Sequence, residues 1–185
     1  LDLDSAQDRV LATIAAPEVQ QGPAAWSPDG KAIAALLLEP APDLETTVAF
    51  FDASSGARRD FLKLPRTILA SLAWLPDGRG LVASGQELRS GTTNNQVFLI
   101  RHPEATVQRV TNDFNQYTSV SVSGGEEAIG ALRITRLANL WLADAGGEPA
   151  RPLTSITNPE DSPLGISVTG RGDLVYAAPR DQYLQ

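Results

Sequence analysis

Cysteine and methionine are absent from the 185 residues of this chain, and histidine occurs once, as His102. Without cysteine there is no disulfide, no thiolate metal site and no cysteine nucleophile. Zinc sites draw on several His or Cys ligands, so a single histidine excludes one for practical purposes. A Ser-His-Asp triad would have to use His102, and the sequence has no Gly-x-Ser-x-Gly motif for its serine. We therefore expect no metal, no cofactor and no catalytic residue in this chain.

Clusters of basic residues and long apolar runs are also missing. The 15 Lys and Arg residues are scattered among 22 Asp and Glu, with a net charge of −7. Affinity for phosphate needs clustered cations, so neither nucleic acid nor an anionic membrane surface is an expected partner. The longest apolar run, residues 32–38, has the length of a strand and is far shorter than the roughly 18 to 20 residues that cross a bilayer. We expect no membrane insertion within this segment.

The start of the sequence shows no signal-peptide pattern. It lacks an initiator methionine and begins in what resembles the middle of a strand. We therefore expect the chain to be part of a longer polypeptide. The composition, with 42% hydrophobic and 20% charged residues, is that of a folded protein.

A repeat with a period near 48 residues organises what is present. WSPDGK starts at residue 26 and WLPDGR at residue 74, and each precedes an apolar run. Two copies without the Pro-Asp pair, VSGGEE at 122 and VTGRGD at 168, continue the series at spacings of 48 and 46 residues. A fixed period of this length is typical of repeat architectures and propellers.

The Pro-Asp-Gly segment has the chemistry of a tight turn. Pro28 presets φ, Asp29 can accept a hydrogen bond from its own backbone, and Gly30 tolerates positive φ. We therefore predict hairpin turns at both copies and assign Asp29 and Asp77 to the turns rather than to catalysis. Two further strands follow in each unit, which makes each unit a four-stranded meander. No segment has the apolar periodicity of a helix.

The predicted fold class is all-β, a β-propeller of four-stranded antiparallel blades. The second strand of each unit is almost wholly apolar, as expected where both sheet faces are covered. The fourth strand of the first unit carries charge, which suits an exposed outer edge. A β-sandwich is the main alternative, but it would show alternation in most strands and no fixed period. The predicted bounds, within one propeller segment of residues 1–185, are 22–65, 70–112 and 117–155 for full blades, 1–16 for strands three and four of a blade, and 164–185 for the first strands of another.

The repeat resembles that of TolB-type (WD40-like, PD40) propellers. The residues that carry the resemblance are WSPDGK and the run NLWLAD from residue 139, followed by RPLT from residue 151. The run QRVTNDFNQY from residue 108 resembles a blade junction in propellers fused to bacterial serine/threonine kinases and transcriptional regulators. The resemblance implies a sensor or interaction domain of a bacterial signalling protein, outside the cytoplasm rather than within it. Composition alone leaves the compartment unknown.

Ring closure has two solutions at the level of sequence. Residues 1–4 and 10–14 are predicted to form strands three and four of a blade, and residues 166–178 to form strands one and two. Joined, they would close a four-bladed ring. If residues 183–185 instead begin a third strand, the chain continues into a larger ring. We favour the second solution, because propellers typically have four to eight blades and four is the lower end.

The loops at one end of the blades are the predicted contact surface. Residues 39–45, 87–95 and 133–138 link second to third strands, and they share that face with the connections between blades. Binding residues concentrate on loops that a rigid scaffold positions. Arg and Tyr are frequent in contact surfaces. The predicted contact residues are Asn115, Tyr117, Arg133 and Arg136.

Two other polar features are predicted to be ordinary turn residues. His102 lies between two strands and is expected to be solvent-exposed, since a catalytic base needs a nucleophile and an orienting partner within reach. The acidic cluster near the start lacks the central Gly and the closing Glu of a calcium loop, because Gln7 and Thr13 stand there. It consists of Asp2, Asp4 and Asp8.

These observations favour a non-catalytic binding or scaffold module whose partner is a protein, a peptide or a small ligand at one propeller face. The alternative is the gating propeller of a prolyl-oligopeptidase-like serine peptidase whose catalytic domain lies outside this chain.

Overall fold

The computed structural model describes residues 8–40, 42, 44–88, 94–113, 115–124, 128–135, 137–143, 146, 149–157, 165–177, 179–180 and 183–184. The chain divides into two compact units, Leu1–Arg133 and Ile134–Gln185, and each is described by itself. All regular structure in the described residues is β-strand, which confirms the predicted all-β class.

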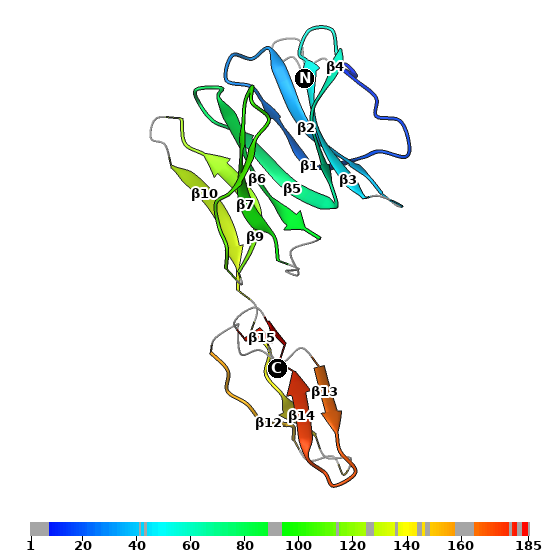
Figure 1. The fold of residues 1–185 in the computed structure, drawn as a ribbon, viewed down its shortest axis with the longest axis vertical. Coiled ribbons are helices and arrows are strands. Elements are labelled where there is room, and N and C mark those ends of the chain that lie inside the picture. Colours follow the sequence, from blue (N-terminus) through cyan, green and yellow to red (C-terminus); the bar gives the residue numbers. More distant parts are fainter. Residues whose placement is uncertain are drawn as a thin grey trace. The chain divides into compact units, whose positions relative to one another are not determined.

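The first unit begins with two four-stranded antiparallel meanders (Figure 1). The first sheet has the order β1-β2-β3-β4 and the second β5-β6-β7-β8. The strands of the first are β1 (Val19–Trp26), β2 (Ala32–Glu39), β3 (Glu45–Asp52) and β4 (Arg58–Pro65). Those of the second are β5 (Thr67–Trp74), β6 (Gly80–Glu87), β7 (Gln96–Arg101) and β8 (Val107–Arg109). Only Arg66 separates β4 from β5, so one meander leads directly into the next.

Shorter strand pairs follow the two meanders. β9 (Gln116–Val122) and β10 (Ile129–Ile134) form a hairpin in which β9 lies against β5 and β6. The second unit holds three two-stranded hairpins. Their strands are β11 (Trp141–Leu142), β12 (Arg151–Pro152), β13 (Gly165–Val168), β14 (Leu174–Ala177), β15 (Pro179–Arg180) and β16 (Tyr183–Leu184). The strand predicted at residues 183–185 is present as β16, and its partner is β15. The predicted blade bounds and ring closure stay predictions.

The turns follow the predicted chemistry. Gly30 and Gly78 have φ of 70° and 71°, and each amide donates to a carbonyl three residues back. The Asp29 carboxylate accepts from the Ser27 hydroxyl at 2.7 Å and from the Lys31 amide at 3.1 Å. These hydrogen bonds, with that of the Ser27 hydroxyl first, lower the pKa of Asp29. The Asp29 carboxylate therefore stabilises the turn, which is the role predicted from the sequence.

Burial of the second strands agrees with stacked blades in two cases out of four. The central residues of β2 and nearly all of β6 are buried, whereas every residue of β10 is exposed and no residue of β14 is buried. A single core joins the two sheets, with Leu36, Val48 and Phe50 from the first against Leu69 and Leu81 from the second. The sheets therefore pack face to face through apolar side chains, as blades of a propeller do.

An aromatic cluster lies in this core, and it corrects the prediction for His102. The Phe50 ring stacks on Phe61 at 4.7 Å and lies 5.1 Å from Trp74. The His102 imidazole lies 5.3 to 5.8 Å from these three rings. His102 is therefore partly buried rather than solvent-exposed. The turn that carries it comes from the second sheet and covers the aromatic side chains of the first.

The strand predicted at residues 10–14 is absent, because residues 8–15 pair with no strand. Val10 is 84% exposed, while Ile14 packs against the outer side of the first sheet. The Arg9 guanidinium donates to the carbonyls of Ala53 and Ser54 in the β3–β4 turn. The segment is thus held by side chains at a turn and not by backbone pairing along a sheet edge.

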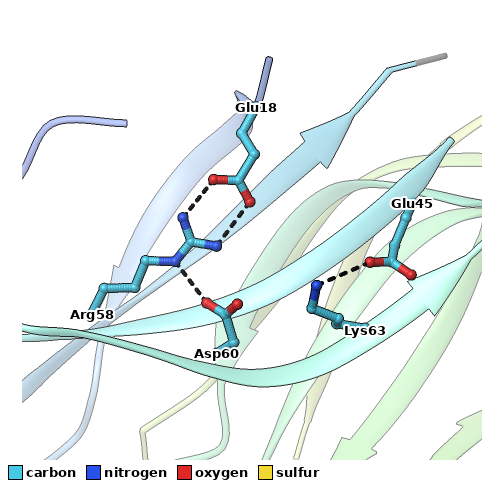
Figure 2. A network of polar contacts seen from close by, with 5 residues as sticks. All are labelled: Glu18, Glu45, Arg58, Asp60 and Lys63. Atoms are coloured by element: carbon cyan, nitrogen blue, oxygen red, sulfur yellow. Dashed lines mark hydrogen bonds and ion pairs between the residues drawn. The ribbon is translucent and has the colours of Figure 1, made fainter. Parts of the chain in front are cut away.

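Three of the four charged side chains on β4, those of Arg58, Asp60 and Lys63, form ion pairs, as Figure 2 shows. The Arg58 guanidinium binds Glu18, from the segment before β1, through two nitrogens and also reaches Asp60 at 2.6 Å. Lys63 lies 3.4 Å from Glu45. The hydrogen bond from Arg58 holds the pKa of Glu18 below its usual value, against the opposing effect of burial. The charged fourth strand predicted from the sequence is therefore an ordered, paired edge.

The Glu18 pair makes stability depend on pH. Because the pKa of Glu18 is lowered in the folded state, its contribution is present above its ordinary pKa and is lost as pH falls through the lowered value. We expect Glu18→Gln to lower the free energy of unfolding by less than about 1 kcal/mol at pH 7, the usual size for a pair near the surface. The deficit shrinks as pH falls through the lowered pKa of Glu18, where the wild-type carboxylate is protonated too. Urea denaturation at pH 7 and at a series of lower pH values measures it. Glu104→Gln, in an exposed turn, is the control and should leave the free energy of unfolding unchanged across the series.

Candidate functional site

The connection between β8 and β9 is fixed by one buried amide side chain. Gln96, at the start of β7, is 1% exposed. Its Nε2 donates to the carbonyls of Asp113 and Asn115 at 3.0 and 3.1 Å. Its Oε1 accepts from the Thr111 hydroxyl at 2.9 Å and from the Asp113 amide at 3.2 Å. Gln96 thus satisfies backbone groups on both sides of the bend and holds the connection in one conformation.

The same device recurs in the second unit. Asn139 Oδ1 accepts from the Thr154 hydroxyl and from the Ile156 amide, as Gln96 Oε1 accepts from Thr111 and Asp113. Each threonine hydroxyl also accepts a hydrogen bond at 2.9 Å from the backbone amide of the residue after the Gln or Asn, which is Val97 or Leu140. Both pairs are separated by 15 residues. Besides the turn motif, this amide–threonine arrangement therefore occurs in two of the repeat units.

Removing this lock is expected to cost stability. Gln96→Ala deletes four hydrogen bonds and leaves partly buried partners unsatisfied; the cost for a fully buried group is about 1 to 3 kcal/mol. Because the segment can partly rehydrate, we expect a loss of about 2 to 4 kcal/mol in the free energy of unfolding. Chemical denaturation measures it. Gln108→Ala, on the exposed face of β8, is the matched control and should change stability by less than about 0.5 kcal/mol.

The locked connection presents a polar cluster that includes three of the four predicted contact residues. The exposed Asp113 carboxylate accepts a hydrogen bond from the backbone amide of Asn115 at 2.9 Å and one from the Tyr117 hydroxyl at 2.8 Å. Arg133, in β10, lies near enough for its charge to act on both Asp113 and Tyr117. We name Asp113, Asn115, Tyr117 and Arg133 the Asp113 surface. Residues 20 positions apart in the sequence meet here because β9 and β10 form a hairpin.

Electrostatics keeps this cluster charged. Burial by itself would raise the pKa of Asp113, but hydrogen bonds from Asn115 and Tyr117, with the Arg133 charge, outweigh it and lower the pKa. Burial and the hydrogen bond to Asp113 raise the pKa of Tyr117. At neutral pH the surface therefore presents an anionic carboxylate, a neutral phenol and a guanidinium. It offers both hydrogen-bond donors and acceptors to a partner, and no nucleophile with a base beside it.

The remaining predicted residues have different outcomes. Arg136 lies outside the described residues, as do Asp2 and Asp4 of the acidic cluster. The three second-to-third strand loops are described only in part. Sequence reasoning missed Asp113 and Gln96, which organise the surface. The 15-residue spacing of an amide and a threonine, repeated after 43 residues, is the signal that could have found Gln96.

Within the described ranges, no group of three or more His, Asp or Glu side chains could hold a metal ion. Over the same residues, no helix has the length and apolar character needed to span a bilayer.

Comparison with solved structures identifies the architecture. The structure of TolB from Acinetobacter baumannii matches over 97% of this chain with a TM-score of 0.57 and 19% identity. This chain therefore has the fold of part of a TolB-like β-propeller. The TolB-like match extends to a putative TolB from Agrobacterium tumefaciens, over 77% of this chain with a TM-score of 0.51 and 16% identity. These matches confirm, at the level of the fold, the resemblance noted from the repeat.

The chain spans about half the length or less of these TolB-like structures, covering 42% and 50% of them. No protein-family model matches the sequence. No curated protein matches it either. The similarity therefore concerns the architecture of the blades.

Proposed function

We propose that this chain is a non-catalytic propeller module that binds a protein, a peptide or a small ligand through the Asp113 surface. One observation carries the proposal: Asn115 and Tyr117 donate hydrogen bonds to one carboxylate, and the charge of Arg133 also acts on it. This carboxylate lies on a connection that the buried Gln96 holds in place. A loop that is already held in one conformation loses little conformational entropy on binding, and this favours affinity. Arg and Tyr, together with Trp, are enriched among the central residues that contribute most to binding.

The proposal gives this segment no reaction of its own. Its support is the sequence, which has one histidine, no cysteine and no nucleophile motif. A place in a bacterial signalling protein, outside the cytoplasm, extends the proposal and rests on the resemblance of the blade junction. The full gene separates the options. A kinase catalytic loop elsewhere in it supports the sensor, and a Gly-x-Ser-x-Gly motif supports the peptidase alternative.

The experimental test begins with a random decapeptide library displayed on phage and selected on the 185-residue chain. We expect peptides with micromolar affinity by isothermal titration, and we expect Arg133→Ala to weaken them at least tenfold. Tyr117→Phe should weaken them less, because it keeps the ring and removes only the hydroxyl. Lys31→Ala, which removes one cation from the β1–β2 turn, is the control and should bind as the wild type does. Selected peptides that bind Arg133→Ala undiminished, or no enrichment at all, would contradict the proposal.

A further inference from the structure

A cavity of about 380 Å³ lies at the end of β9 opposite to the Asp113 surface. Residues of the β5–β6 turn, the end of β7, the end of β9 and the start of β10 line it. Its apolar lining consists of Leu75, Pro76, Leu99, Val122 and Ile129. The volume is within the range of about 300 to 1,000 Å³ that is usual for small-ligand sites, which are mostly apolar with a few polar groups.

The cavity exists because two aromatic positions of the repeat are aliphatic here. Val122 follows Trp74 at the repeat spacing of 48 residues. Leu99 corresponds to Phe50, because each lies two residues before a β-turn residue, Arg101 or Asp52, that makes the same backbone hydrogen bonds.

At the first junction the rings of Phe50 and Trp74 lie 5.1 Å apart and fill the space between the two sheets. At the second junction Leu99 and Val122 line the cavity in their place. The second junction therefore has smaller side chains than the first and lacks the two aromatic rings that fill the first.

Among the lining residues that the structure describes, the charges favour an anion. Arg79 Nε binds the Asp77 carboxylate at 2.7 Å, so these two lining charges balance each other. Arg101 is exposed at the rim, and its guanidinium has no hydrogen bond or ion pair with any side chain in the described part of the chain. A guanidinium is suited to a carboxylate, which it can bind through two parallel hydrogen bonds.

We propose that this cavity binds a small aromatic carboxylate, with the ring between Leu99 and Val122 and the carboxylate on Arg101. The ring supplies the volume that Phe50 and Trp74 supply at the first junction, and the guanidinium pairs with the charge. The site is independent of the Asp113 surface, since the two lie at opposite ends of β9.

The test is a titration of the isotope-labelled chain with 3-phenylpropionate, followed by amide chemical shifts in two-dimensional NMR spectra. We expect saturable shifts at Leu75, Leu99 and Val122, and none at Asn115 and Tyr117. The neutral analogue 3-phenylpropionamide should bind about tenfold more weakly, the effect of losing one charge-assisted interaction. Arg101→Ala should weaken 3-phenylpropionate to the same extent, whereas Lys31→Ala should bind it as the wild type does.

The double variant Leu99→Phe with Val122→Trp copies the first junction into the second and should abolish binding by filling the cavity. Leu99→Phe alone is the milder variant if the double variant does not fold, and it should weaken binding at least fivefold. Unchanged shifts at the lining amides with 3-phenylpropionate would overturn the proposal. So would equal affinity for the amide, or a folded Leu99→Phe variant that binds as the wild type does. These outcomes do not depend on whether the Asp113 surface binds peptides.

Discussion

Gly22→Ala is expected to destabilise the chain by about 4 kcal/mol, a loss that only a few mechanisms such as a steric clash produce. Gly22 has φ of 62°, a region that costs an L-residue about 1 to 2 kcal/mol. A Cβ atom there would lie 2.1 Å from the carbonyl oxygen of Ala70. Ala70 belongs to β5 of the second sheet, so relieving the clash requires the two sheets, or the irregular part of β1 between Gln21 and Ala25, to move away from each other. Urea denaturation, or loss of the folded state on expression, measures the effect.

The matched control for this prediction is Gly78→Ala. Gly78 has φ of 71°, but a Cβ atom added there meets nothing within 4 Å. Gly78→Ala therefore measures only the cost of placing an alanine at positive φ, which we expect to be about 1 kcal/mol in the free energy of unfolding. Equal losses for the two variants would show that the sheets do not approach as closely at Gly22 as the structure has them.

Phe50→Ala is the second large effect, with an expected loss of about 3 to 5 kcal/mol in the free energy of unfolding. Phe50 is 5% exposed and contacts the rings of Phe61, Trp74 and His102. Its removal opens a cavity between the sheets and also ends the ring-to-ring contacts, each worth about 0.5 to 1.5 kcal/mol beyond area. Thermal and urea denaturation measure the loss.

Two further variants make this prediction specific to the junction between sheets. Phe50→Leu, which copies the residue at position 99, should cost less than Phe50→Ala because it keeps most of the volume. Phe51→Ala removes a ring from the opposite side of the first sheet, where Ala35 and Leu37 surround it. Only the Phe50 variants should change the near-ultraviolet circular dichroism of Trp74. A Phe51→Ala spectrum changed in the same way would argue against the assigned junction.

Local chemistry made much of this fold predictable. A Pro-Asp-Gly turn needs only the φ of its own residues, and Gly30 and Gly78 adopt the positive φ expected of them. Apolar second strands predict covered faces, and β2 and β6 have them. Asn115, Tyr117 and Arg133 could be placed at one end of the blades because the meander fixes which loops share an end. The sequence did not predict that the Asp113 carboxylate would interact with all three of these residues.

The features that escaped prediction depend on contacts between distant segments. His102 looks like a turn residue in its own sequence, yet the ring contacts that bury it come from Phe50 and Phe61 of the preceding sheet. Gln96 lies at a strand start, and its role becomes visible only with Thr111 and Asp113 beside it. For β10 the prediction of burial was wrong: its sequence is largely apolar, but all of its residues are exposed in the structure. Local pattern specifies strands and turns, while stacking decides which polar groups are buried.

The central claim is that two stacked sheets form a rigid platform that holds the Asp113 surface in place. Native-state hydrogen exchange of backbone amides tests it most directly, because it reports the free energy of opening at each amide. We predict that the amides of Leu36 in β2 and Val82 in β6 exchange only through global unfolding, with the same free energy. The Asn115 amide, bound to the Asp113 carboxylate, should also be protected. Different opening energies for Leu36 and Val82, or an Asn115 amide that exchanges as fast as in an unfolded chain, would contradict the account.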